Sequence, residues 1–265
     1  MKKLSQERVC QAYLKKSPFA HALPRILEGF VLQEFELKPP ILDLGCGDGV
    51  FARICLGKGK VEVGLEPDPQ VVRLAEKSGA YKEVVVAKAE KMPFKDDFFK
   101  TIISNSVLEH IEDLDLVFQE AYRVLKKEGR FIFLVPDKTA SDYFFYAWFL
   151  EKMRLKGLAN AYINLKNKLY HYAHLEKKDF WEKIAKRHGF KIRQVVGLIS
   201  PQTVKIMDFF TPLALPDYFL RKVFGRSFVF RPDFINQAMG AYLIRKLKAV
   251  KGIEATAWYF EYEKN

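Results

Sequence analysis

Glycines and carboxylates early in the chain have the spacing of a ligand-binding turn. The stretch ILDLGCGDGVF, residues 41–51, places three glycines within five positions, directly behind an apolar run that contains Asp43. Glycine lets the backbone turn tightly and approach a ligand closely, and N–H groups at the start of a following helix are free to donate. Because Asp43 and Asp48 are poor neighbours for a pyrophosphate, the turn indicates a ligand with a cationic end.

The spacing also separates two kinds of nucleotide turn. A dinucleotide fingerprint requires G-x-G-x-x-G, but the sequence from Gly45 reads GCGDGV, so Val50 stands where the last glycine belongs. The third glycine, Gly49, comes one residue early. An NAD-dependent dehydrogenase is therefore the weaker interpretation.

The elements around this turn alternate between strands and helices. Amphipathic helices are expected after the second strand and over residues 114–125, and continuous apolar runs are typical of strands buried on both faces. This order predicts an α/β fold with a mainly parallel sheet and helices on both faces. The sequence places its first five strands at residues 41–44, 61–65, 83–87, 101–104 and 130–135.

The remaining segments flank this core. Residues 5–36 predict one or two helices, and residues 140–172 predict a helical excursion rich in Tyr and Phe. We divide the chain into an N-terminal helical segment, 1–38, a ligand-binding core, 39–137, and a C-terminal part, 138–265, within one structural domain. The C-terminal part is expected to contain a helix over 176–188, a strand over 190–199, a helix over 234–250 and a last strand over 255–262.

Residues 43–49, which read D-x-G-x-G-x-G, resemble motif I of class I S-adenosylmethionine-dependent methyltransferases. Residues 84–111 resemble the segment that covers the adenine in this family, and residues 120–136 resemble the helix and fifth strand that follow. The resemblance implies a Rossmann-like, seven-stranded sheet. It also implies methyl transfer from S-adenosyl-L-methionine, with S-adenosyl-L-homocysteine as the product.

The resemblance further implies a set of cofactor contacts. Glu66 matches the acidic residue that takes both ribose hydroxyls, and Asp43 is expected near the methionine amino group. Asn105 and Ser106 either line the methionine end or merely terminate the fourth strand. Lys88 replaces an aspartate that contacts the adenine amino group in many members. The expected cofactor-binding residues are Asp43, Gly45, Cys46, Gly47, Glu66, Pro67, Ala89, Glu90, Asn105 and Ser106.

Three histidines are candidates for chemistry. His110 follows the fourth strand, where a general base could take a proton from a hydroxyl or ammonium acceptor, since histidine titrates near neutral pH. The alternative is that His110 caps the helix that begins near Asp113. His171 and His174 are three residues apart, but no third ligand of suitable type accompanies them, so no metal site is expected.

The charge distribution bears on the acceptor. The net charge of +12 falls entirely within residues 138–265, because basic and acidic residues are equal in number before them. This half is also aromatic, which favours an anionic partner. Nucleic acid is disfavoured as the acceptor, because SNSVLE stands where base-amino methylases carry N/D-P-P-Y/F.

Residues 218–234 suit an anionic membrane surface, with Arg221, Lys222, Arg226 and Arg231 among bulky apolar groups. Residues 142–153 could add an apolar wall; alternatively, both segments form a lid.

These observations predict a methyltransferase that acts on a small-molecule or lipid-like, amphipathic acceptor. An RNA methyltransferase and a cofactor-binding protein without catalysis remain as alternatives. The charged N-terminus and the absence of an apolar run of about 20 residues predict a cytoplasmic protein without a transmembrane segment, with peripheral membrane association as a further expectation. Cys10, Cys46 and Cys55 are expected to be packing residues.

Overall fold

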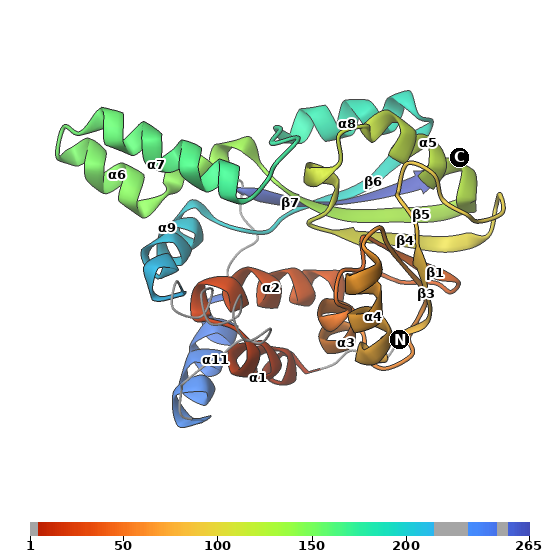
Figure 1. Cartoon of the computed structure of the whole chain (residues 1–265), viewed down its shortest axis with the longest axis horizontal. Coiled ribbons are helices and arrows are strands. Elements are labelled where there is room, and N and C mark those ends of the chain that lie inside the picture. Colours follow the sequence, from red (N-terminus) through yellow and green to blue (C-terminus); the bar gives the residue numbers. More distant parts are fainter. Residues whose placement is uncertain (1–4, 215–232, 248–253) are drawn as a thin grey trace.

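A seven-stranded sheet lies at the centre of the computed structural model, which describes residues 5–214, 233–247 and 254–265. The strand order is β3-β2-β1-β4-β5-β7-β6, and β7 alone runs antiparallel to its neighbours (Figure 1). The predicted α/β fold is confirmed. The strands are β1 (Ile41–Leu44), β2 (Val61–Glu66), β3 (Tyr81–Val86), β4 (Phe99–Asn105), β5 (Leu125–Pro136), β6 (Phe190–Gly197) and β7 (Ala257–Lys264).

Helices cover both faces of this sheet, and successive strand residues alternate between two cores. Ile132 packs with α1, α2 and α3 on one face, whereas Phe131 and Phe133 pack with α5 and α8 on the other. The described helices are α1 (Gln6–Lys16), α2 (Phe19–Leu32), α3 (Val50–Cys55), α4 (Pro69–Ser78), α5 (Leu114–Val124), α6 (Phe145–Lys152), α7 (Lys156–Leu169), α8 (Lys178–Arg187), α9 (Pro201–Phe209) and α11 (Asp233–Leu247), with short 3-10 turns η1 (Leu108–His110), η2 (Lys138–Tyr143) and η3 (Thr211–Ala214).

Several boundaries differ from those that the sequence predicts, and two of them have a clear structural cause. β3 begins at Tyr81, two residues early, because Tyr81 pairs with Val61 at the start of β2. β5 begins at Leu125, which the apolar spacing had placed at the end of the preceding helix; Leu125 pairs with Phe99 instead. The charged residues 126–128 hide this extension, because they break the apolar pattern of the strand. In α4, the amphipathic helix expected after the second strand, Val72 and Ala75 are buried, whereas Leu74 is 52% exposed.

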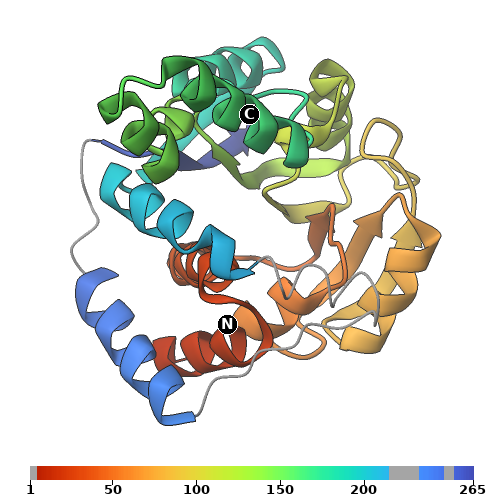
Figure 2. The same cartoon turned by 60° about the vertical axis from the view of Figure 1, so that its left-hand side comes forward.

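The helical excursion forms a hairpin of α6 and α7 that projects from one end of the sheet (Figure 1). α9 joins this hairpin to the N-terminal helices, since Phe145 contacts Phe209 and Phe19 contacts Phe210 through their rings. α11 lies beside α1 (Figure 2), and the Gln11 side chain donates to the Asn236 carbonyl at 3.1 Å. Of these elements, α2, α7 and α9 contribute residues to a cavity beside the end of β5.

Part of the predicted basic and aromatic segment, including Arg221, Lys222, Arg226 and Arg231, lies outside the described residues. Among the described helices, none combines the length and the apolar character needed to cross a bilayer. Within the same residues there is no cluster of side chains suited to a metal ion.

Candidate functional site

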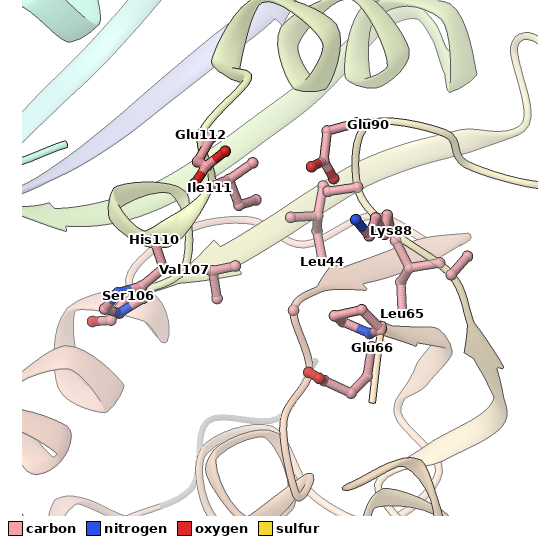
Figure 3. A pocket seen from close by; sticks show the side chains of 14 residues that line it. Leu44, Leu65, Glu66, Lys88, Glu90, Ser106, Val107, His110, Ile111 and Glu112 are labelled. Carbon is pink, nitrogen blue, oxygen red and sulfur yellow. The ribbon is translucent and has the colours of Figure 1, made fainter. Parts of the chain in front are cut away.

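A cavity of about 560 Å³ opens where β1, β2 and β4 end (Figure 3). It brings together many of the residues that the sequence predicts as cofactor or catalytic contacts. Figure 3 shows Glu66, Lys88 and Glu90 on one side of this cofactor cavity, and Ser106 and His110 across from them. The predicted residues among its lining are Gly45, Glu66, Pro67, Ala89, Glu90, Ser106 and His110.

The glycine turn has a backbone that only glycine adopts readily. Gly45, Gly47 and Gly49 have φ angles of 74°, 54° and 72°, in the left-handed region. The N–H groups of Gly45 and Cys46 both donate to the Leu65 carbonyl, at 2.8 and 2.9 Å. A Cβ at Gly45 would lie 2.4 Å from a methyl carbon of Val107, whereas one at Gly47 would meet no atom within 4 Å. The turn is therefore packed on one side and open on the other.

Glu66 connects this turn to the end of β2. Its Oε2 accepts a hydrogen bond from the Gly47 N–H at 3.1 Å, and its Oε1 accepts one from Asp68 at 3.3 Å. The carboxylate is thus held in place at the wall of the cofactor cavity. Asp48, predicted to be unfavourable for a pyrophosphate, has a local role: its Oδ1 accepts the N–H of Val50 at the start of α3.

Asp43, Cys46 and Gly47 lie in the same turn but are not among the residues that line the cavity. Asp43 is buried, and the Tyr81 hydroxyl donates to its Oδ2 at 2.7 Å. Burial raises the pKa of the Asp43 carboxyl to about 6, while the hydrogen bond from Tyr81 acts in the opposite direction. Burial likewise raises the pKa of the Cys46 thiol above its usual range. The cofactor contacts predicted for these residues stay predictions.

The loop that carries Ala89 and Glu90 is held by a residue that the sequence reasoning missed. Arg123, on α5, donates to the carbonyls of Phe94 and Met92 at 2.7 and 2.9 Å. Its pairing with Glu120 is visible in the sequence as an i, i+3 pair, but its contacts with the loop are long-range. Both Lys88 and Ala89 line the cavity; Ala89 is buried, whereas the Lys88 side chain (Figure 3) is exposed.

Asn105 and Ser106, although adjacent, face different surroundings. The Asn105 amide donates to Glu28 Oε2 at 2.8 Å, and the Tyr259 hydroxyl donates to Asn105 Oδ1. Asn105 therefore joins a buried polar network between α2 and β7, and it does not line the cofactor cavity. Ser106 lines it, with a left-handed φ of 56°.

His110 lies between the cofactor cavity and a second cavity. Its ring stacks on Tyr172, with centroids 5.6 Å apart, and its Nδ1 is 3.1 Å from the His171 carbonyl. The helix-capping alternative is wrong, because Asp113 itself accepts the N–H of Leu116 at the start of α5. His174 instead contacts the Glu112 carbonyl at 2.9 Å.

The second cavity, of about 330 Å³, is lined by α2, η1, β5, η2, α7, α9 and the chain around residues 170–175. It shares Ser106 and His110 with the cofactor cavity. Its walls are mostly apolar, with Phe144 from the predicted apolar segment among them. The polar groups among its lining include Arg25, Glu28 and Glu109. Distant elements build this second cavity, so of its walls the sequence predicts only the apolar segment that contains Phe144.

Comparisons with known proteins agree with this geometry. Residues 42–133 match the family model described as a methyltransferase domain. An uncharacterized protein of Methanocaldococcus jannaschii is 35% identical over 37% of this chain and 44% of its own length. A malonyl-[acyl-carrier protein] O-methyltransferase of Hamiltonella defensa is 29% identical over 35% and 36% of the two chains. The chain thus spans less than half the length of these relatives.

A solved structure from Thermotoga maritima, described as a methyltransferase dependent on S-adenosylmethionine and a possible histamine N-methyltransferase, has the same fold. Its TM-score is 0.60 at 18% identity, over 93% of this chain and 91% of that one. Residues 42–133 therefore form a methyltransferase domain of class I, for which S-adenosylmethionine is the cofactor, and the predicted class is confirmed.

Proposed function

We propose that the chain transfers a methyl group from S-adenosylmethionine to a small or amphipathic acceptor. The observation that carries this proposal is the meeting of the two cavities at Ser106 and His110. One cavity has the glycine turn and Glu66, and the other has apolar walls that suit an organic acceptor. Adjoining cavities suit a methyl transfer, because the acceptor atom has to lie in line with the bond that breaks.

The residues of the cofactor cavity fit the expected cofactor. Gly45 and Glu66 line the cavity, and the held carboxylate of Glu66 can accept two hydroxyl hydrogens of a ribose. Gly47 lies in the same turn, and the space beside it is open. Asp43, Gly45, Cys46 and Gly47 would hold the methionine side with Ser106, and Pro67, Ala89 and Glu90 would hold the adenosine side; Asn105 is left out, because its amide is engaged by Glu28 and Tyr259. When bound, S-adenosylmethionine supplies a methyl group on a positively charged sulfur.

The chain's own contribution is to orient the acceptor and exclude water. The second cavity is closed by η2, α7 and α9, which supports a C-terminal part that selects the acceptor. Its apolar residues, including Leu134, Ile199 and Val204, would desolvate the reacting groups. The proposal keeps the predicted division into an N-terminal segment, 1–38, a cofactor core, 39–137, and a C-terminal part that selects the acceptor, 138–265, and it adds α2 of the N-terminal segment to the acceptor side.

Glu66→Gln and Glu66→Ala are expected to weaken binding of S-adenosylhomocysteine about 10- to 100-fold, because a buried hydroxyl loses a charged hydrogen-bond acceptor. Titration calorimetry measures the affinity. Gln keeps an acceptor for the Gly47 N–H, so its effect isolates the ribose contact. Glu83→Ala removes the same charge from an exposed position on β3 and is the matched control.

Two outcomes would contradict the proposed function. Unchanged affinity in both Glu66 variants would remove Glu66 from the ribose site. Binding of NAD with no response to S-adenosylmethionine would replace the cofactor altogether. Transfer of a labelled methyl group from S-adenosylmethionine to fractionated cell extract, followed by identification of the labelled compound, tests catalysis and excludes or establishes an RNA acceptor.

The same proposal includes an anionic membrane surface as a partner. Trp148, Phe149 and Phe209 form an exposed aromatic cluster, each 40–48% exposed, and are joined through contacts with the Phe145 ring. Lys205 lies over the Trp148 ring at 5.2 Å. Exposed aromatic rings beside a cation suit the interface of an anionic bilayer.

The double variant Trp148→Ser/Phe149→Ser is expected to reduce co-sedimentation with phosphatidylserine-containing vesicles at least about tenfold, because two apolar side chains no longer enter the interface. Leu74→Ser, which removes an equally exposed apolar side chain from α4, is the control and leaves binding unchanged. Equal binding of both variants, or absence of binding by the parent chain, would remove the membrane from the proposal.

A further inference from the structure

Glu109 is a buried carboxylate that the proposed methyl transfer leaves without a role. Its side chain is 2% exposed, and it lines the second cavity. Its Oε2 has no hydrogen-bond partner among the residues that the structure describes. Burying a carboxylate without a partner is costly, so such a group indicates a missing partner.

The charged groups around Glu109 are engaged elsewhere. On α2, Arg25 donates to Glu28 Oε2 at 2.8 Å, and the same oxygen also accepts from Asn105. Within Glu109's own turn, His110 Nε2 lies 4.0 Å from Glu109 Oε1, beyond hydrogen-bond distance. The positive charge of Arg25 is already neutralised by Glu28. A negative charge on Glu109 would therefore have no cation of its own at the wall of the second cavity.

The position of Glu109 is fixed by its backbone. The Glu109 carbonyl accepts the N–H groups of Ala173 and His174 at 2.8 and 2.9 Å. This holds the chain around residues 170–175 against η1, and Tyr172 stacks on His110 in the same contact. The carboxylate is therefore held at the cavity wall beside the residue that joins the two cavities.

We propose that Glu109 binds the ammonium end of a small amine acceptor and takes its proton before the nitrogen is methylated. This inference rests on the proposed function and names the acceptor class for the second cavity. The organic part of the amine would pack against apolar residues of the same cavity, such as Phe144, Val204 and Met207. A positive charge would supply the partner that Glu109 Oε2 lacks.

The chemistry balances at Glu109. One N–H bond of the ammonium breaks, and its proton forms an O–H bond on the carboxylate, which leaves a nitrogen lone pair. That pair forms the new bond to the methyl carbon, and the electrons of the broken carbon–sulfur bond stay on sulfur. The product is a methylated ammonium, and the proton on Glu109 then passes to water.

The electrostatics around Glu109 agree with this role. Burial raises the pKa of Glu109 to about 8; a hydrogen bond from its own backbone N–H and the charge of Arg25 lower the pKa, and Glu28 raises it further. Near neutral pH the carboxyl is then mainly protonated until a cation arrives. Tyr172 and His110 also face the group, and His21 lines the same cavity. Binding of an ammonium should therefore expel a proton from Glu109.

Phenethylamine and its neutral isostere 2-phenylethanol are suitable probes, titrated by calorimetry into the full chain saturated with S-adenosylhomocysteine. We expect the amine to bind at least about tenfold more tightly than the alcohol, because a charged hydrogen bond is stronger than a neutral one. At pH 7, titrations in two buffers of different ionisation enthalpy should show nearly one proton released per amine bound, falling toward zero above about pH 9.

Glu109→Gln should remove both the preference for the amine and the proton release, with S-adenosylhomocysteine affinity unchanged, because Glu109 does not line the cofactor cavity. His110→Asn should keep the proton release, which separates Glu109 from its neighbour. Equal binding of the two probes, or proton release that survives Glu109→Gln, would overturn the inference. If either result occurs while S-adenosylhomocysteine still binds, the Glu109 inference fails but the proposed methyltransferase function stands. Failure of the inference can therefore be told apart from failure of the proposed function.

Discussion

Gly45→Ala is expected to reduce affinity for S-adenosylhomocysteine at least about a hundredfold. The new Cβ would lie 2.4 and 2.5 Å from the two methyl carbons of Val107, and the residue would keep a φ of 74°. Left-handed backbone costs an L-residue about 1–2 kcal/mol, and overpacking adds about 1–3 kcal/mol. The turn can relieve this strain only by moving, and every predicted contact of the methionine end moves with it. Calorimetry with S-adenosylhomocysteine gives the measurement.

Two further variants identify the cause. Gly59→Ala imposes the same kind of backbone, with a φ of 59°, but its Cβ would meet nothing within 4 Å, so its affinity should match that of the parent. Adding Val107→Ala to Gly45→Ala removes the clashing methyl groups and should restore part of the binding. If Gly45→Ala binds normally, the close packing of the turn on Val107 is not what shapes the cofactor cavity.

The glycine turn shows why the sequence could predict the cofactor cavity. Gly45, Asp43 and Glu66 belong to one turn and the next strand end, and adjacent parallel strands bring their carboxyl ends to one edge. Local spacing therefore translates directly into spatial proximity. The parallel sheet could also be predicted from local patterns. Apolar strands that alternate with amphipathic helices are typical of a parallel sheet with helices on both faces.

The acceptor side could not be predicted in this way. Asn105 was expected at the mouth of the site, yet its amide is taken by Glu28 and Tyr259, which are 77 and 154 positions away. In the sequence, Glu109 has no feature that distinguishes it from an exposed polar residue. It is buried because α2 and the chain around residue 173 pack against it. Such contacts depend on tertiary packing between segments that share no local pattern.

A buried ion pair in the same region gives the largest expected effect on stability. Lys166 on α7 and Asp208 on α9 lie 3.0 Å apart, with side chains 8% and 1% exposed. The Tyr162 hydroxyl donates to Asp208 Oδ1 at 2.6 Å, which fixes the carboxylate between the two helices. Asp208→Ala should therefore lower the free energy of unfolding by about 3–5 kcal/mol, because it leaves a buried ammonium without its partner. Urea denaturation followed by circular dichroism measures the change.

The loss of unfolding free energy expected for Asp208→Ala comes from leaving the Lys166 ammonium buried without a partner. A second substitution should show this. Adding Lys166→Met to Asp208→Ala removes the stranded ammonium and should recover most of the loss, since a buried pair can be replaced by apolar groups at little cost. Glu36, whose side chain is 65% exposed, pairs with Lys38 and Arg130, and Glu36→Ala should cost less than about 1 kcal/mol, because an exposed carboxylate contributes little. Because Lys166 also lies over the Phe144 ring at 5.1 Å, Asp208→Ala should disturb the second cavity and spare the binding of S-adenosylhomocysteine. A loss of both together would mean that α7 and α9 support the cofactor core as well as the acceptor side.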